Sequence, residues 1–385
     1  MIGTRFPADE ELTLILEFVA ASLQITQTQH DRADTAYNSV TSWLGAEGSP
    51  LEGYDPLLFP QGSLRLGTTV KPLKKTEFDL DVVCLLRMNG GATPGEVYEL
   101  VWDRMWSHKT YRSIMERMPR CIRLNYAEDS QFHLDIVPAI PDISKGGTFI
   151  RIPERPSPKL STWRTSNPKG YAFWFERQMV YLEKYARAQV EPLPVQDSSA
   201  KKPALSKAVQ LIKRWRDVWF KDDMHLAPSS IILTTLAAEQ YNGEATCCDA
   251  LTNILEGMVV FARSNRRDLY NPANRAELIS EKWVKDEAAY RAFCDRIVEF
   301  RDKWQKVLDT ARSPIRGIGD VAKLLYELFG EPVVGAIKKA EERVAKSRDS
   351  GNLYMERTSG SLITSLSAPT VSSVSKVRPN TFYGE

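Results

Sequence analysis

Residues that build disulfide frameworks and zinc centres are scarce in this chain. Of its 385 residues, five are cysteine and four are histidine, and no Cys-x-x-Cys pair occurs. An odd number of widely spaced cysteines argues against both a disulfide scaffold and a zinc ribbon. Four histidines are too few to assemble a zinc site around them. We therefore expect free thiols.

Long apolar runs and a strong net charge are also missing. No stretch of 18 apolar residues occurs, and the start MIGTRFPADEELT lacks the basic-then-apolar order of a secretory signal. We expect neither membrane insertion nor export, and hence a cytoplasmic protein. Lysine and arginine number 51 against 49 acidic residues, which leaves a net charge of +2. Binding to long nucleic acid is therefore not implied, and any phosphate site must be local.

The apolar content, 43% of the residues, is enough to fill a sizeable core. Hydrophobic periodicity predicts two helices within 8–45, strands up to about 140, irregular chain over 141–170 and helices over 171–346. The expected strands cover 57–59, 68–72, 78–85, 122–126 and 132–137, with a helix at 94–104. The serine-rich segment 347–385 is predicted to be a mobile tail.

The segment FDLDVV, residues 78–83, places two acids inside an apolar strand pattern. A strand's period of two puts Asp79 and Asp81 on one face while the apolar residues between them face the core. Carboxylates about 6–7 Å apart along a strand can share a pair of divalent cations, as in nucleotidyl transfer. Mg²⁺ suits such a site because it binds one or two carboxylates, waters and substrate phosphates. An edge strand with a polar outer face is the alternative.

Two flanking features favour the metal-binding interpretation. Upstream, Gln61-Gly62-Ser63 predicts a turn where the missing Cβ lets backbone N–H groups approach a triphosphate, and the serine hydroxyl adds a donor. Downstream, FHLDIV (132–137) repeats the alternation and supplies Asp135, a third acid on a neighbouring strand. Such an acid is needed to help bind the metal that activates an attacking hydroxyl. The three features together are far more specific than any one of them.

The Gly-Ser turn and the three acids resemble the polymerase-β-like nucleotidyltransferase superfamily. More narrowly, QGSLRLGTTVKP with EFDLDVV is similar to the cyclic GMP-AMP synthase and DncV-like group, the CD-NTases of bacterial CBASS anti-phage defence, which are related to oligoadenylate synthases. The resemblance covers roughly residues 50–310. It implies an α/β (α+β) fold with N-terminal helices and a catalytic lobe with a mixed central sheet (1–170), followed by a mainly helical lobe (171–346).

The resemblance also implies phosphate-binding residues in the helical lobe. ALSKAVQLIKRWRDVW, followed by HLAPSSIILTTLAAEQY, is similar to a helix pair in which a lysine and a later serine grip the donor phosphates. It implies Lys213 and Ser229 or Ser230 in these roles, with Lys207 as a weaker candidate. A solvated lysine and helix-capping serines are the alternatives, and capping can coexist with anion binding.

Other polar residues have structural interpretations. Arg65 can reach a phosphate or lie on the surface, and His133 fits a structural strand histidine. Asn271, Asn274 and Glu277 fit the start of a helix and are left out of the predicted site.

Two departures from the family pattern limit what it implies. Fifteen residues separate the Gly-Ser turn from the first acid, which is more than usual in the superfamily. Cys247-Cys248 has neither a histidine just upstream nor a third cysteine nearby, so the zinc thumb and DNA activation of the animal enzyme are not implied.

The reaction implied by the resemblance joins ribonucleoside triphosphates, ATP among them, into a cyclic di- or trinucleotide. Two Mg²⁺ ions, with Mn²⁺ as an alternative, would be bound by Asp79, Asp81 and Asp135. The implied partners are an operon-encoded effector that responds to the product and ubiquitin-like conjugation machinery acting on the ending TFYGE, for which an inert end is the alternative. Linear oligonucleotide synthesis, another nucleotidyl transfer and low-turnover nucleotide binding are rival hypotheses. The last is disfavoured because carboxylates repel one another when packed together without metal.

Overall fold

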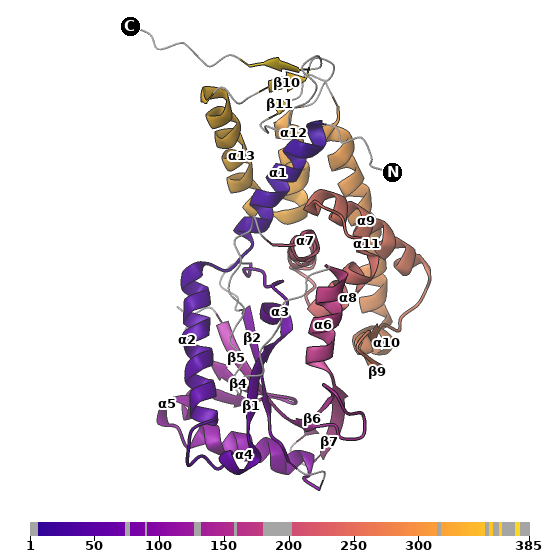
Figure 1. Ribbon diagram of the computed structural model, residues 1–385. Coiled ribbons are helices and arrows are strands. Elements are labelled where there is room, and N and C mark those ends of the chain that lie inside the picture. The colour runs from indigo at the N-terminus through magenta and orange to yellow at the C-terminus, as the bar shows by residue number, and fades with distance from the viewer. Residues whose placement is uncertain are drawn as a thin grey trace.

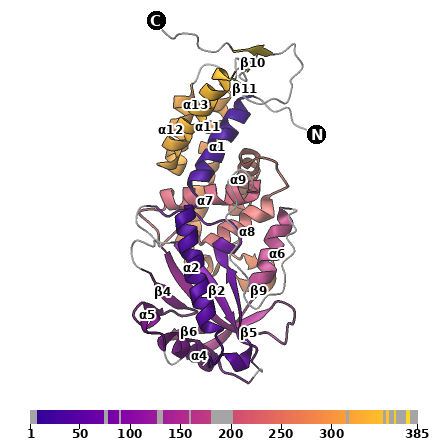
Figure 2. The ribbon, with the colours of Figure 1, turned by 60° about the vertical axis from the view of Figure 1, so that its left-hand side comes forward.

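A computed structural model describes residues 7–73, 78–88, 91–126, 132–157, 160–179, 202–313, 317–350, 354–356, 362–363 and 374–377. A twisted sheet occupies one end of the molecule and a group of helices the other (Figures 1 and 2). This combination of a mixed sheet with a helical second part confirms the predicted fold class.

The seven-stranded sheet is mixed. Its order is β1-β2-β5-β4-β3, and β6 pairs with β5 and β7. The central pair β2 and β5 is parallel, whereas all other pairs are antiparallel. The strands are β1 (Leu57–Gln61), β2 (Phe78–Leu85), β3 (Met115–Arg117), β4 (Ile122–Asn125), β5 (Phe132–Pro141), β6 (Ile150–Ser157) and β7 (Leu160–Ser166).

Helices α2 (Gln27–Leu44) and α4 (Pro94–Trp106) bury their apolar stripes in the same core as β2 and β5. Figure 1 shows α2 along one side of the sheet and α4 across its end. Each helix begins with a capping box, at Thr26 and Thr93, in which the threonine and the residue three positions later satisfy one another's backbone N–H groups. The short helices η1 (Glu52–Tyr54), α3 (Gly62–Arg65) and α5 (Lys109–Arg112) lie in the connections.

The second and larger core is helical. It is built around α7, whose Trp215 stacks on Phe300 of α11 with ring centroids 4.7 Å apart. The elements of this region are α6 (Pro168–Gln178), α7 (Ala204–Trp219), α8 (Ser230–Gln240), α9 (Cys247–Arg263), α10 (Glu281–Lys285), α11 (Glu287–Ala311), α12 (Ile318–Phe329) and α13 (Pro332–Asp349), with the hairpin β8 (Tyr270–Asn271) and β9 (Asn274–Leu278).

The first helix, α1 (Pro7–Ser22), also buries its apolar residues in the helical core rather than in the sheet core. Figure 1 shows it beside α13, far from the sheet. The chain therefore contributes its N-terminal helix to the lobe that the sequence predicts to begin at 171. The division at 1–170 and 171–346 stays a prediction.

The strand expected at 68–72 is wrong. This segment has no regular secondary structure and runs across α7, whose polar side chains take the place of a neighbouring strand. Its carbonyl groups accept hydrogen bonds from three α7 side chains: Gln210 to Thr69 (2.7 Å), Lys213 to Thr68 (3.1 Å) and Arg214 to Lys71. The valine and threonines of the segment suggest a strand, but partners distant in sequence decide its conformation.

The irregular chain expected over 141–170 is also wrong, because β6 and β7 form a hairpin there. Two prolines in β6 misled the prediction. Pro153 pairs with Trp163 of β7, whereas among the described residues β6 pairs with β5 only at Ile150 and Arg151, so Pro153 lies beyond the stretch of β6 that has β5 as a second neighbour. A proline is tolerated at such a position because it lacks only the N–H group that a second neighbour would need.

Within the predicted mobile tail the structure describes three short strands, β10 (Tyr354–Glu356), β11 (Leu362–Ile363) and β12 (Val374–Lys376). They form a small antiparallel sheet in the order β11-β10-β12. The ending TFYGE lies outside the described residues. All five cysteines lie within the described residues and none of them forms a disulfide, as expected. In the described part of the chain, no helix combines the length and the hydropathy that a membrane span requires.

Replacing Trp215 by alanine should lower the free energy of unfolding by about 3–5 kcal/mol, because the fully buried indole leaves a cavity at the centre of the helical core. The matched control is Trp106→Ala at a side chain that is 46% exposed, which should cost about 1 kcal/mol or less. Denaturant unfolding of the two variants measures the difference. Similar losses in both would contradict the assignment of Trp215 to the core.

Candidate active site

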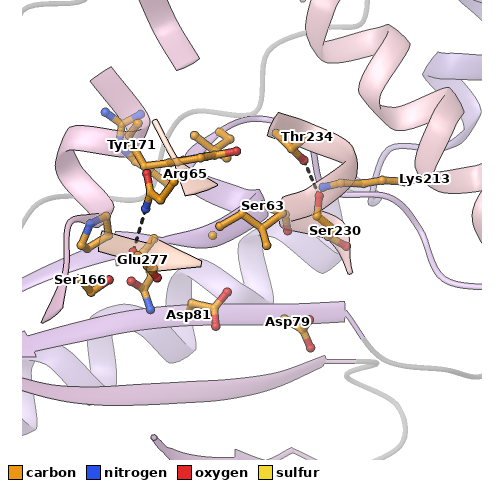
Figure 3. A pocket seen from close by; sticks show the side chains of 17 residues that line it. Ser63, Arg65, Asp79, Asp81, Ser166, Tyr171, Lys213, Ser230, Thr234 and Glu277 are labelled. Carbon is orange, nitrogen blue, oxygen red and sulfur yellow. Dashed lines mark hydrogen bonds between the residues drawn. The ribbon is translucent and has the colours of Figure 1, made fainter. Parts of the chain in front are cut away.

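A cavity of about 330 Å³ lies between one face of the sheet and the helices α6, α7 and α8. In Figure 3, Asp79 and Asp81 lie along one side of it, Lys213 and Ser230 at one end, and Tyr171, Ser166 and Glu277 at the other. Of the predicted site residues, the cavity is lined by Gln61, Gly62, Ser63, Asp79, Asp81, Lys213 and Ser230. Asp135 and Ser229 do not line it.

The strand alternation predicted for FDLDVV is confirmed. Phe78, Leu80 and Val82 are buried in the sheet core, and Asp79 and Asp81 project from the other face. The parallel register between β2 and β5 sets Asp81 opposite Asp135 and Asp79 opposite His133. Three carboxylates and one imidazole therefore share one face of two adjacent strands.

Two of these acids are held by cationic groups. Asp135 accepts two parallel hydrogen bonds of 2.8 Å from the guanidinium of Arg123 on β4, and Oδ1 of Asp79 lies 2.7 Å from Nε2 of His133. Arg123 escaped sequence analysis because it meets Asp135 only through the β4–β5 register. His133 is a direct neighbour of the predicted site rather than only a strand histidine.

The third acid, Asp81, forms no ion pair of this kind with any residue that the structure describes. Its pKa therefore responds most strongly to its burial beside the other two carboxylates. Burial, and then the charges of Asp79 and Asp135, raise its pKa to about 7. By contrast, the hydrogen bond to His133 keeps the pKa of Asp79 below its ordinary value. A cation placed between Asp79 and Asp81 would remove the repulsion that raises the pKa of Asp81.

Gly62 is required by the approach of the turn to Asp81. Its φ of +67° is in the left-handed region, and a Cβ at this position would lie 2.2 Å from Oδ2 of Asp81. The glycine therefore lets the backbone of α3 lie directly against the carboxylate. Ser63 follows in the first turn of α3, and its hydroxyl lies 3.1 Å from that of Thr69.

At the end of the cavity opposite Glu277, Lys213 is almost completely buried. It donates hydrogen bonds to the carbonyl and hydroxyl oxygens of Thr68, at 3.1 and 3.0 Å. Burial, and then the charge of Arg216, lower its pKa to about 7. Ser230 opens α8, and its hydroxyl accepts a hydrogen bond of 3.0 Å from Arg216. An anion at this end would favour the charged form of the lysine.

The weaker candidates are distributed differently. Ser229 is the exposed N-cap residue of α8 and its side chain makes no capping hydrogen bond, whereas Lys207 pairs with Glu17 of α1. Arg65 does line the cavity, where it forms an ion pair of 2.6 Å with Glu176 of α6.

Sequence analysis missed the end of the cavity formed by Tyr171, Asn271 and Glu277. The segment that contains Asn271 and Glu277 was interpreted as the start of a helix, but it forms the hairpin β8–β9. Asn271 and Pro272 are also typical of a turn, which was the available signal.

No three histidine, cysteine or acidic side chains in the described part of the chain form a ready-made metal centre. The donor set nevertheless fits Mg²⁺, because Asp79 and Asp81 offer carboxylate oxygens on one face, and burial together with the charges of Asp79 and Asp135 raises the pKa of Asp81. Both oxygens of Asp135 are engaged by Arg123. Its role as a third metal ligand stays a prediction.

The fold and the site define the class of protein. The mixed sheet with two acids on β2, the Gly-Ser helix start against Asp81 and the lysine of α7 agree with the resemblance to polymerase-β-like nucleotidyltransferases, whose fold the chain has.

The comparisons with known proteins identify the family. Residues 14–178 match the model of the Second Messenger Oligonucleotide or Dinucleotide Synthetase domain. The chain is 34% identical to a c-di-GMP synthase of Roseivirga ehrenbergii over 98% of both chains, and 23% identical to the cyclic dinucleotide synthase CdnG of Bradyrhizobium diazoefficiens over 92% of this chain and 89% of the relative. The chain belongs to the CD-NTase family of cyclic oligonucleotide synthases.

Solved structures show the same fold. The Bradyrhizobium diazoefficiens CD-NTase CdnG in complex with GTP matches with a TM-score of 0.68 and 22% identity, over 86% of this chain and 98% of that one. The Vibrio cholerae DncV cyclic AMP-GMP synthase matches with a TM-score of 0.57 and 14% identity, over 82% and 94%. CD-NTases generally use divalent metals.

The Asp81→Asn variant should be more stable than the wild type in metal-free buffer at pH 8. The folded-state pKa of about 7 exceeds the ordinary value of 3.8, so stability falls as the pH rises from about 4 to 7 and the full loss persists above pH 7. The pKa difference corresponds to about 4 kcal/mol, and partial exposure reduces the expected gain to the order of 2 kcal/mol.

Denaturant unfolding in EDTA at pH 8 and pH 5 measures this gain, which should be smaller at pH 5. Addition of Mg²⁺ should stabilise the wild type more than the variant. The account is contradicted if Asp81→Asn is less stable than the wild type at pH 8 without metal.

Proposed function

We propose that this enzyme joins two ribonucleoside triphosphates into a cyclic dinucleotide by two successive nucleotidyl transfers that release pyrophosphate. The observation that carries the proposal is the cavity itself, which brings Asp79 and Asp81 together with the α3 turn and with Lys213. In each transfer, a ribose hydroxyl oxygen of one nucleotide forms a bond to the α-phosphorus of the other. The bond to the pyrophosphate oxygen breaks, and the hydroxyl proton passes to base or solvent.

The proposed donor triphosphate lies between the α3 turn and the start of α8. Lys213 and the hydroxyl groups of Ser63 and Ser230 would bind its β- and γ-phosphates, and the backbone N–H groups at the start of α3, which Gly62 allows to lie against Asp81, would donate to it. Phosphate oxygens would replace part of the hydrogen bonding that Lys213 now makes to Thr68. This binding aligns the leaving pyrophosphate and excludes water from it.

Asp79, Asp81 and Asp135 would bind two Mg²⁺ ions, with Mn²⁺ as an alternative. When bound, such ions supply the positive charge that stabilises the attacking and leaving oxygens of an in-line displacement. The residues of the chain contribute orientation. His133 lowers the pKa of Asp79 and Arg123 orients Asp135, so that little rearrangement of β2 and β5 is needed.

The size of the product is inferred from relatives. The c-di-GMP synthase of Roseivirga ehrenbergii and the cyclic dinucleotide synthase CdnG both carry names of cyclic dinucleotide synthases. A solved complex of CdnG contains GTP. These names support guanine in the product and a dinucleotide over a trinucleotide, whereas a linear oligonucleotide or another nucleotidyl transfer is the rival outcome.

The biological role proposed from the family resemblance is anti-phage signalling in the cytoplasm. The product would activate an effector encoded in the same operon. Conjugation of the C-terminus to a partner stays a further prediction, because TFYGE lies outside the described residues.

The test is to incubate the full chain with GTP, ATP, CTP and UTP and Mg²⁺, and to identify products by liquid chromatography with mass spectrometry. We expect a cyclic dinucleotide that contains guanine. Asp79→Asn should lower its yield by about 100-fold or more, because charge stabilisation at the reacting phosphate is lost. The exposed Asp103→Asn is the matched control and should retain full activity. Linear products, or equal activity of Asp79→Asn, would overturn the proposal.

A further inference from the structure

The cavity has an acidic group at the end opposite Lys213. Glu277 lines the cavity from β9, and Figure 3 shows it beside Ser166, away from Lys213 and Ser230. Phosphates bound at the lysine end would leave this end to the ribose and the base. A carboxylate here is unfavourable for any further phosphate, so its presence indicates a ligand group with hydrogen-bond donors.

The carboxylate of Glu277 is fixed through one of its two oxygens. Oε2 accepts a hydrogen bond of 2.9 Å from Nδ2 of Asn271, and Nδ2 of Asn274 lies 3.5 Å away. Both asparagines are buried, with 3% of each exposed, and Oδ1 of Asn271 is held by the backbone N–H of Ala273 at 2.9 Å. The orientation of the carboxylate is therefore set before a ligand binds.

The other oxygen, Oε1, makes no hydrogen bond to any residue that the structure describes. No lysine or arginine within the described ranges forms an ion pair with Glu277 either. Arg65, the cation on the wall of the same cavity, is paired with Glu176. Glu277 thus presents a charged acceptor whose partner has to come from the ligand.

Tyr171 contributes a largely buried aromatic ring to the lining at the same end of the cavity. Its hydroxyl is 2.9 Å from that of Thr235, so the polar tip of the side chain is occupied and the ring is held in place. An aromatic ring stacks on any base, whereas a neighbouring hydrogen-bonding group decides which base fits. The specificity must therefore come from the polar wall formed by Asn271 and Glu277.

Among the four common bases, guanine alone presents two adjacent donors, N1–H and the N2 amino group, which fit Oε1 of Glu277 and the second lone pair of Oε2, the first being used by Asn271. Adenine presents one donor beside an acceptor, which an ionised acid repels. We propose that Glu277 selects guanine at this end of the cavity by accepting hydrogen bonds from N1–H and N2–H. This inference rests on the proposed binding of a nucleoside triphosphate in the cavity.

The test compares the equilibrium binding of GTP, ITP, ATP and 2′-deoxy-GTP to the full-length protein by calorimetry, with Ca²⁺ in place of Mg²⁺ to suppress turnover. ITP lacks only the N2 amino group of GTP. We expect the wild type to bind GTP about 10-fold more tightly than ITP, the value of a hydrogen bond to a charged group. Glu277→Gln should reduce this ratio to about one, while the exposed Glu256→Gln leaves it unchanged.

The outcomes distinguish failure of the proposed function from failure of the role proposed for Glu277. Failure of the wild type to bind any triphosphate would overturn the proposed function and this inference with it. Tight binding with equal affinity for GTP and ITP, or a preference for GTP that persists in Glu277→Gln, would overturn only the role of Glu277. If the wild type bound GTP and ITP equally well and only 2′-deoxy-GTP more weakly, the carboxylate would bind the ribose instead of the base. If Glu277→Gln does not fold, Asn271→Ser replaces it: this variant removes the hydrogen bond that orients the Glu277 carboxylate and should lower the ratio of GTP to ITP affinity, whereas an unchanged ratio would overturn the role of Glu277.

Discussion

The structure depends on the mutual repulsion of three carboxylates on β2 and β5. The parallel register forces Asp79, Asp81 and Asp135 onto one face, and the chain compensates only partly, through His133 and Arg123. Burial of Asp81 and, after it, the charges of Asp79 and Asp135 raise the pKa of Asp81 to about 7. The strands therefore carry an arrangement that is unfavourable by itself, and the binding of a cation would relieve it.

The helical part completes the site through the segment that precedes β2. Residues 68–71 connect α3 to β2, and side chains of α7 hold their carbonyl groups. Because Lys213 both anchors this segment and lines the cavity, the packing of the two parts and the proposed phosphate-binding end of the site share one residue. Gly62, which has no Cβ to collide with Asp81, lets α3 lie against this acid. The segment that follows α3 is thereby held close to the acids of β2.

The elements that the sequence predicted well are those with local signals. Alternation in FDLDVV and FHLDIV placed the acids correctly, and their apolar neighbours are buried in the core. Pairings between distant segments could not be read from the sequence. Arg123 on β4 meets Asp135 on the adjacent strand β5, and Glu277 enters the cavity only because β8–β9 folds back onto it. Local propensity also misassigned 68–72 and the proline-containing β6, where tertiary partners decide the conformation.

The central claim is that Asp79 and Asp81 form a platform for divalent cations beneath a bound triphosphate. The most direct measurement is a crystal structure of the full chain with Mn²⁺ and a non-hydrolysable GTP analogue, with anomalous scattering recorded at the manganese edge. The account predicts anomalous peaks about 2.0–2.2 Å from oxygens of both carboxylates and of the triphosphate. A bound triphosphate with no manganese at Asp79 and Asp81, and with Asp79 still in contact with His133, would contradict it.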